Sequence, residues 1–235
     1  MRELRRLLRW LGRLALACVL VSLTLVTLYH YVDPPLTPLM LIRSVEGRLA
    51  GTPVGIDQRW VPLRAVSPAL LRAVIAGEDA RFFQHWGVDA KELQQARAYN
   101  LRQRGSRLRG GSTITMQCAR SVLLWPSRTY VRKALEVYLT MLLEQLWGKR
   151  RILEVYVNVV EWGSGIYGVE AAAQHYFGMS AAALDGERAA LLAAALPAPR
   201  RFNPAAPSPY LRRRAQTIAA RAKLVELGRT SRRAP

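Results

Sequence analysis

Cysteine and histidine are scarce in this sequence, with two and three residues among 235. Cys18 lies in a long apolar run and Cys118 in the more polar part that follows, so we do not expect a disulfide between them. No cluster of ligand residues suggests a structural metal site, and we interpret Cys118 as a small buried apolar side chain. Internal repeats are also lacking, which disfavours a repeat architecture.

Acidic residues are few, and the 35 Lys and Arg against 16 Asp and Glu give a formal charge of +19. Such an excess attracts polyanions, which include nucleic acid, anionic lipid headgroups and phosphorylated substrates, and charge alone does not choose among them. Two tails contribute heavily to the excess. They comprise Arg2, Arg5, Arg6, Arg9 and Arg13 at one end, and Arg212, Arg213, Arg214, Arg221, Lys223, Arg229, Arg232 and Arg233 at the other.

One stretch lacks charge altogether, because residues 14–32 contain no Asp, Glu, Lys or Arg. As a helix with a rise of about 1.5 Å per residue, this run spans close to the roughly 30 Å hydrocarbon core of a bilayer. The preceding arginines predict that its N-terminal side is cytoplasmic and that the rest of the chain is exported. A cleaved signal peptide is the alternative, although Asp33-Pro34-Pro35 is a poor cleavage site.

Helical signals dominate after a proline-rich linker, and we predict a mainly α-helical chain. Irregular short-range structure is expected at about 40–66, with one or two short strands in 54–61. Ser67, Asp89 and Ser127 are predicted N-caps, the first followed by a proline at the first helical position. Further helices are predicted at about 113–124, 149–158, 171–177, 186–196 and 209–227, the third of these following a glycine-rich bend.

Glu78 and Asp79 follow the helix that begins after Ser67, in a segment rich in Phe and Trp. A carboxylate beside aromatic rings in a partly dry cleft can act as a general base, since desolvation raises its pKa. The alternative is a helix-end turn whose acids pair with Arg81 or solvent. On residue types alone, that alternative is favoured.

Gly110-Gly111-Ser112-Thr113 precedes a predicted helix that carries Gln117 and Arg120 on one face. Free backbone N–H groups and the helix dipole make such a start a natural phosphate cradle, although an ordinary capped helix is the alternative. Nearby cations strengthen the phosphate interpretation. They are Arg109, Arg120, Arg128, Arg132 and Lys133.

Arg128, Arg132 and Glu136 follow one another at four-residue spacing on the predicted fourth helix. The default interpretation of Arg132 and Glu136 is a solvated helix pair worth a few tenths of a kcal/mol. Lys149 and its basic neighbours are likewise interpreted by default as a solvated turn.

Five segments in order resemble the motifs of glycosyltransferase family 51, specifically its monofunctional biosynthetic peptidoglycan transglycosylases. They are Glu78-Asp79-x-x-Phe82-x-x-His85-x-Gly87, Gly110-Gly111-Ser112-Thr113-Ile114-Thr115-x-Gln117, Arg132-Lys133-x-x-Glu136, Lys149-x-x-Ile152-Leu153-Glu154-x-Tyr156-x-Asn158, and Gly163-x-Gly165-x-x-Gly168-x-x-x-Ala172-Ala173-x-x-Tyr176-Phe177. Each motif alone is weak, but five in register, covering about residues 60–226, are very specific.

The resemblance implies a lysozyme-like helical lobe, a smaller membrane-apposed jaw lobe and an N-terminal transmembrane helix. It implies polymerisation of lipid II into β-1,4 glycan strands with release of undecaprenyl pyrophosphate and inversion at the donor carbon. Glu78 resembles the general base and Glu136 the second catalytic glutamate. The implied substrate-binding residues are Asp79, His85, Ser112, Thr113, Gln117, Arg120, Arg128, Arg132, Lys133, Lys149 and Asn158.

The resemblance also implies a division of the chain and a location. The parts are a cytoplasmic tail (1–13), a transmembrane helix (14–32), a juxtamembrane linker (33–59), a glycosyltransferase domain (60–227) and a basic tail (228–235). The expected location is the bacterial inner membrane, with a periplasmic catalytic domain, no transpeptidase activity and cell-wall synthesis or division proteins as partners. A loosely held Mg²⁺ or Mn²⁺ ion often assists this family, and no protein-held metal is expected.

Met116 and Arg120-Ser121 depart from the family pattern, which usually has Gln and Lys-Asn there. Arg120 keeps the charge but changes the geometry of its donors, so the sequence does not determine which group it contacts.

Two other functions compete with glycan polymerisation. A glycan hydrolase needs a second carboxylate for water or a covalent intermediate but has no use for the arginines. A basic membrane protein that binds nucleic acid explains the charge but not the acidic motif or the exported topology.

Overall fold

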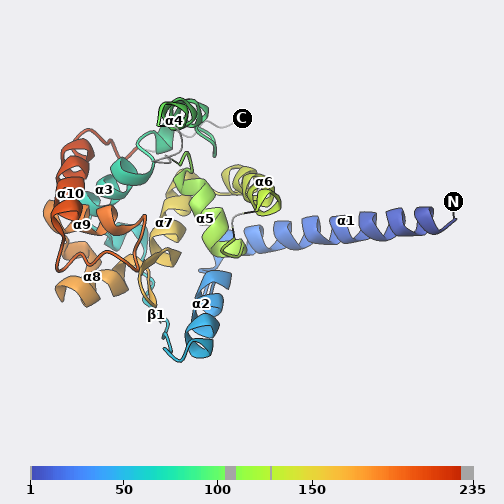
Figure 1. The fold of residues 1–235 in the computed structure, drawn as a ribbon, viewed down its shortest axis with the longest axis horizontal. Helices are drawn as coiled ribbons and strands as arrows, with labels where there is room; N and C mark the ends of the chain where they lie inside the picture. The colour runs from blue at the N-terminus through green and yellow to red at the C-terminus, as the bar shows by residue number, and fades with distance from the viewer. Residues whose placement is uncertain (1, 104–109, 128, 229–235) are drawn as a thin grey trace.

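The computed structural model describes residues 2–103, 110–127 and 129–228. The described chain is mainly helical, as predicted, with one small three-stranded sheet of order β1-β3-β2 (Figure 1). The longer helices are α1 (Arg2–Tyr31), α2 (Pro38–Leu49), α3 (Pro68–Glu78), α4 (Ala90–Arg102), α5 (Ile114–Leu123), α6 (Tyr130–Leu146), α7 (Lys149–Val159), α8 (Val169–Phe177), α9 (Gly186–Ala195) and α10 (Pro209–Ala222). The strands are β1 (Asp57–Gln58), β2 (Glu161–Gly163) and β3 (Ile166–Tyr167), and single 3₁₀ turns cover Leu63–Ala65, Phe82–Gln84 and Ala181–Ala183.

Side-chain capping explains where the helices around the cleft begin. The Ser67 hydroxyl accepts a hydrogen bond from the Ala69 N–H, and the Asp89 carboxylate accepts one from the Glu92 N–H, so both predicted caps are confirmed. The prediction that Ser127 caps the fourth helix is wrong. Thr129 takes that position instead and accepts from the Arg132 N–H, which starts α6 two residues later.

The juxtamembrane segment is more regular than the sequence predicted. Instead of irregular structure from residue 40, it contains α2, whose first turn is capped by the Thr37 hydroxyl and begins with Pro38. Proline is compatible with this position because its missing N–H has no partner at a helix start. The predicted short strand is present as β1, and α10 ends at Ala222 rather than at about 227.

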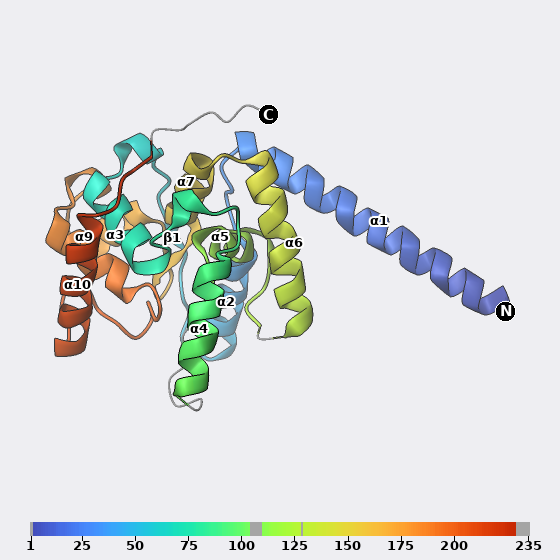
Figure 2. The ribbon, with the colours of Figure 1, turned by 90° about the horizontal axis from the view of Figure 1, so that it is seen from above.

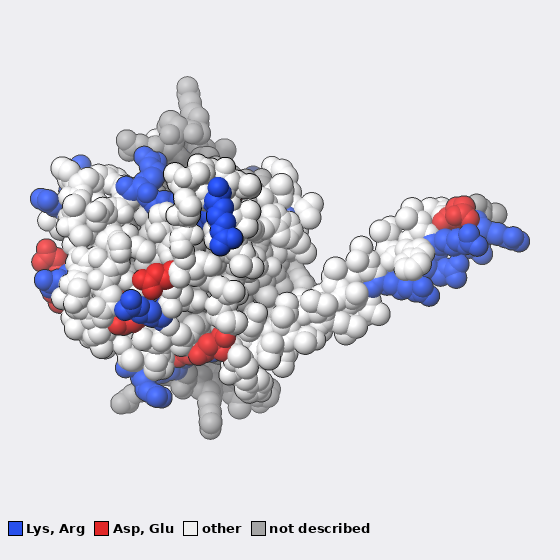
Figure 3. Space-filling view, turned by 90° about the horizontal axis from the view of Figure 1, so that it is seen from below, with Lys and Arg blue, Asp and Glu red and all other residues white. Residues whose placement is uncertain are grey.

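The N-terminal helix α1 projects from the rest of the protein and is long and apolar enough to cross a membrane (Figures 1 and 2). Basic side chains gather at its outer end, and an uncharged stretch separates them from the globular part (Figure 3). This arrangement is consistent with a single-pass anchor, and its orientation stays a prediction.

The inner end of α1 is fixed to the globular part. Val26 is fully buried, and its carbonyl accepts a hydrogen bond of 2.8 Å from the Trp147 indole N–H. The Arg151 guanidinium donates to the carbonyls of Tyr29 and Val32, which are left free at the end of α1. The C-terminal end of α1 is therefore packed against the globular part.

Two groups of helices meet at the candidate site. In one group α3 packs against α9 and α10, and in the other α5 packs against α6 and α7 (Figure 2). The C-terminal end of α3 lies beside the N-terminal half of α5, because the Ile114 N–H donates to the Asp79 carboxylate at 3.0 Å. Four of the predicted site residues, Glu78, Asp79, Ser112 and Thr113, border one small cavity at this junction.

Candidate active site

Glu78 is the last residue of α3, and its side chain is only 11% exposed. One carboxylate oxygen accepts a 2.9 Å hydrogen bond from the Gln117 amide, and the other is 3.8 Å from the Arg214 guanidinium. Within the described residues that second oxygen has no hydrogen-bond donor. Burial raises the pKa of Glu78 above its usual 4.5, against the opposing effects of Gln117 and the two arginines Arg214 and Arg120.

Gln117 is held from its other side by α7. The Tyr156 hydroxyl, which is fully buried, donates to the Gln117 side-chain oxygen at 3.1 Å. Since that oxygen is engaged, the amide NH₂ group is the part that points at Glu78. Tyr156 thereby fixes which end of the amide the carboxylate meets.

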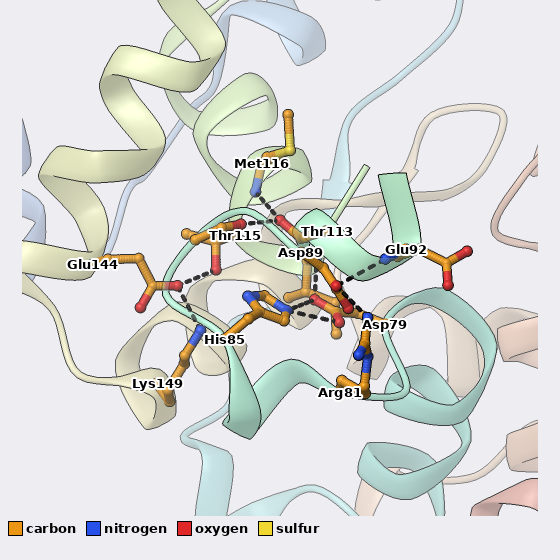
Figure 4. A network of polar contacts seen from close by, with 12 residues as sticks. Asp79, Arg81, His85, Asp89, Glu92, Thr113, Thr115, Met116, Glu144 and Lys149 are labelled. Carbon is orange, nitrogen blue, oxygen red and sulfur yellow. Dashed lines mark hydrogen bonds and ion pairs between the residues drawn. The ribbon is translucent and has the colours of Figure 1, made fainter. Parts of the chain in front are cut away.

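Asp79 organises the start of α5 rather than contacting Glu78 directly. Its carboxylate accepts from the Ile114 N–H and lies 2.9 Å from His85 Nε2 (Figure 4). Arg81 forms an ion pair with Asp89, which also caps α4. These contacts close the loop between α3 and α4 against the first turn of α5.

Asp79, His85 and Asp89 place metal-ligand atoms within 4.8 Å of one another. Both carboxylates already accept backbone N–H groups, from Ile114 and Glu92 respectively. A guanidinium also occupies the Asp89 side of the group, and it would repel a divalent cation. Protein donors therefore already engage both carboxylates of the group, although His85 Nδ1 is buried without a partner among the described residues.

Thr113 and Lys149, two predicted substrate contacts, are used within the protein. The Thr113 hydroxyl caps α5 and donates to the Gly87 carbonyl at 2.5 Å. Lys149 donates to Glu144 at 2.6 Å and lies 4.6 Å from the centre of the Phe82 ring. The same Glu144 oxygen accepts from the Thr115 hydroxyl at 2.6 Å (Figure 4). The default interpretation of Lys149 as a solvated turn is therefore incorrect.

Glu136 is 1% exposed and sits between two cations on α6. One carboxylate oxygen pairs with Arg132 and the other accepts from the Lys133 ammonium at 2.6 Å. Lys133 also donates to the Ser112 hydroxyl at 3.3 Å, which ties α6 to the start of α5. The default expectation of a solvated Arg132–Glu136 pair is wrong, because both side chains are buried.

A cavity of about 410 Å³ borders some of these groups. Gln117, Arg120 and Arg132 line one part of it, together with the hydroxyl-bearing Ser121 and Ser127. A smaller cavity of about 110 Å³ is bordered by Glu78, Asp79 and Ser112. Gln117 therefore contacts the acid on one side and borders the cationic cavity on the other.

Asn158 does not face the cleft. It is fully buried, and its amide exchanges hydrogen bonds with the N–H and carbonyl of Val61 and donates to the Glu154 carbonyl. It connects α7 to the segment before α3. Arg109 and Arg128, two of the predicted cations, lie outside the described residues.

The part of the chain that holds these residues is similar to known proteins. The transglycosylase family model matches residues 47–223, which include every described candidate site residue. The chain belongs to the transglycosylase family. Similar transglycosylases include the biosynthetic peptidoglycan transglycosylases of Caulobacter vibrioides (52% identical, 92% of each chain covered), Rhodospirillum centenum (49%, covering 94% of this chain and 92% of the relative) and Pseudomonas syringae (45%, 96% and 92%).

Two residues of this transglycosylase site were not singled out from the sequence. Tyr156 appears in the sequence analysis only as part of a motif, and Arg214 only among the arginines that contribute to the charge excess. Instead Arg214 donates to the Ala194 carbonyl at 3.2 Å and reaches Glu78 from α10. No local pattern points to either role, since both depend on helices that pack from elsewhere in the chain.

Proposed function

We propose that this chain is a peptidoglycan glycosyltransferase that polymerises lipid II into β-1,4 glycan strands and releases undecaprenyl pyrophosphate. The observation that carries the proposal is the position of Gln117, which contacts the acid Glu78 and borders a cavity lined by Arg120 and Arg132. Transfer from a diphosphate donor needs both a base and a cationic site for the leaving group. The names of the similar transglycosylases support the same substrate class.

Glu78 acts as the general base in this proposal. It removes the proton from the 4-hydroxyl of the acceptor sugar as that oxygen attacks the donor anomeric carbon. Because its pKa is raised by burial, the carboxylate is a better proton acceptor than an exposed glutamate. Attack from the face opposite the diphosphate gives inversion in one displacement.

Arg120, Arg132 and Lys133 stabilise the departing diphosphate. Guanidinium groups bind phosphate oxygens through paired N–H donors. Glu136 holds Arg132 and Lys133 in place, and in this proposal it positions the leaving side rather than accepting a proton. With both oxygens engaged by cations, it is poorly placed to activate the water that a glycan hydrolase needs.

We assign no resident metal to the Asp79, His85 and Asp89 group, because a cation there would have to displace Arg81 from Asp89. An Mg²⁺ or Mn²⁺ ion that assists the reaction would instead accompany the substrate diphosphate. The protein's own cations hold the diphosphate in this proposal, and Glu78 meets the acceptor, without such an ion.

The anchor places this chemistry at the bacterial inner membrane in our proposal, with the N-terminus cytoplasmic and the catalytic part periplasmic. A lipid-linked substrate then reaches the cleft from the bilayer, and its partners are lipid II, the growing strand, and cell-wall synthesis or division proteins. Nucleic acid is not a partner on that side of the membrane.

The test is incubation of the purified full-length protein with labelled lipid II, with and without a divalent cation. We expect a glycan polymer that lysozyme digests, together with free undecaprenyl pyrophosphate. Purified peptidoglycan serves as the second substrate. Soluble fragments from it, without polymer from lipid II, would establish the hydrolase instead.

A further inference from the structure

The cavity of about 410 Å³ has a second wall that the proposed chemistry does not use. It is formed by Arg43 on α2 and Glu161 on β2, whereas the other polar residues of the lining come from α5, α6 and the segment between them. The Glu161 side chain is 9% exposed, so its carboxylate is largely withdrawn from bulk water.

Glu161 is poorly satisfied within the described part of the chain. Its nearest cationic atom is Arg43 Nε at 3.8 Å, which is within ion-pair range but too long for a hydrogen bond. Burial raises the pKa of Glu161 despite the charges of Arg43 and Arg200. Within the described residues no donor lies within hydrogen-bond distance of the Glu161 carboxylate, so its oxygens on the cavity wall are available to a ligand donor.

Arg43, in turn, has a donor without an acceptor. Its Nη1 is engaged by Glu46 at 2.7 Å, but its Nε–H is buried and has no acceptor among the described residues. The wall therefore presents one free donor and one free acceptor, 3.8 Å apart. A single hydroxyl oxygen about 2.8 Å from each atom can accept from Arg43 and donate to Glu161 at once. A phosphate cannot, because it would face the carboxylate.

We propose that Arg43 and Glu161 bind a sugar hydroxyl of the lipid-linked substrate, in the same cavity as the cations Arg120 and Arg132 that hold its diphosphate. This inference rests on the proposed function, because it takes the saccharide next to the diphosphate as the ligand. It assigns recognition of the sugar to α2 and β2, and recognition of the diphosphate to α5 and α6.

Equilibrium binding separates the two roles. Lipid II and saccharide-free undecaprenyl diphosphate are titrated in detergent against the full-length protein and its variants. We expect Glu161→Ala to weaken lipid II binding about 10- to 100-fold, the effect of losing a hydrogen bond to a charged group. Binding of undecaprenyl diphosphate should not weaken. Arg132→Ala should weaken both ligands.

Two further variants distinguish binding from folding. Glu161→Gln keeps an acceptor oxygen and should lose less affinity for lipid II than Glu161→Ala. Glu46→Ala removes the outer partner of Arg43 but leaves the cavity wall intact, and it should bind lipid II as the unmodified protein does. Thermal unfolding of each variant verifies that it is folded.

The inference is overturned if Glu161→Ala binds lipid II normally, or if it loses both ligands equally, as a distortion of the cavity would cause. A different result would contradict the proposed function. If the unmodified protein binds lipid II in the predicted pattern but forms no polymer, the hydroxyl site stands and the polymerase assignment does not.

Discussion

The two glutamates predicted for catalysis lie in contrasting environments. Glu78, at the end of α3, receives one amide hydrogen bond and a distant arginine, and one of its oxygens has no donor within the described residues. Glu136, on α6, has a cation on each oxygen. The carboxylate of Glu78 is thus able to accept a proton, whereas that of Glu136 is occupied by two cations.

The difference arises from neighbouring elements rather than from local sequence alone. Glu136 has Lys133 and Arg132 three and four positions away, where a helix brings side chains together. Glu78 ends its helix, and its surroundings come from α5, α7 and α10. If this comparison is correct, substitution at the two positions must affect different quantities.

The largest effect on turnover is expected for Glu78→Gln. Removal of a general base lowers kcat by about 10²- to 10⁴-fold. The substitution should not destabilise the fold. A buried carboxyl whose pKa is raised binds more protons in the folded state, so its contribution to stability falls as pH rises above its unfolded pKa. The neutral amide avoids that loss at neutral pH.

The measurement for Glu78→Gln combines polymer formation from labelled lipid II with thermal unfolding at pH 7. An unfolding midpoint equal to or above that of the unmodified protein is the expected companion of lost activity. Retention of full polymerisation would remove Glu78 from the role of base.

Glu136→Gln should show the reverse pattern, with stability as the main loss. It leaves Arg132 buried beside a neutral group, and breaking a buried ion pair costs about 3 kcal/mol. For a domain of this size that corresponds to a fall in Tm of roughly 6–12 °C. Turnover should fall mostly through weaker substrate binding. A variant as stable as Glu78→Gln would show that the two sites do not differ as proposed.

Lys133→Ala tests the leaving-group side with a smaller effect. Its side chain is 42% exposed, so we expect KM for lipid II to rise about 3- to 10-fold, with little change in stability. Arg188→Ala is the matched control, because Arg188 is 44% exposed and also pairs with an acid three residues away, at the start of α9. Equal kinetic effects from both would indicate a general loss of positive charge rather than a lost contact.

The sequence predicts features that depend on residues close together in the chain better than features that depend on distant residues. Caps such as Ser67 and Asp89 act within three residues, and the sequence predicts them correctly. The choice of Thr129 over Ser127 depends on where α6 can start against its neighbours, and local propensity does not separate two nearby hydroxyl residues. The α2 helix was missed because prolines around it resemble a linker.

The candidate site shows the same limit. The acid of Glu78 and the basic face of α6 are visible as motifs, since their residues are close in sequence. The contribution of Arg214 is not, because a distant helix brings it to Glu78, and its neighbours in the chain resemble a solvated tail. The sequence predicts which groups do chemistry more readily than which groups tune them.

Tyr156→Phe should give the smallest effect and the most specific one. Without the hydroxyl, the Gln117 amide is free to turn its oxygen toward Glu78. An oxygen there would disfavour the carboxylate, whereas the N–H it replaces favours it, so the pKa of Glu78 should rise further. A base with a higher pKa is protonated over a wider range, which moves the acidic limb of the pH profile of kcat/KM to higher pH.

We therefore expect Tyr156→Phe to lose about 2- to 5-fold in kcat/KM at neutral pH and to recover most of the loss at higher pH, since a hydrogen bond of this kind is worth about 1 kcal/mol. Gln117→Ala removes the amide itself and should shift the same limb in the same direction. A uniform loss at all pH values would mean that Tyr156 supports the packing of α7 against α5 and does not orient the amide. The comparison between the two glutamates would then rest on burial alone.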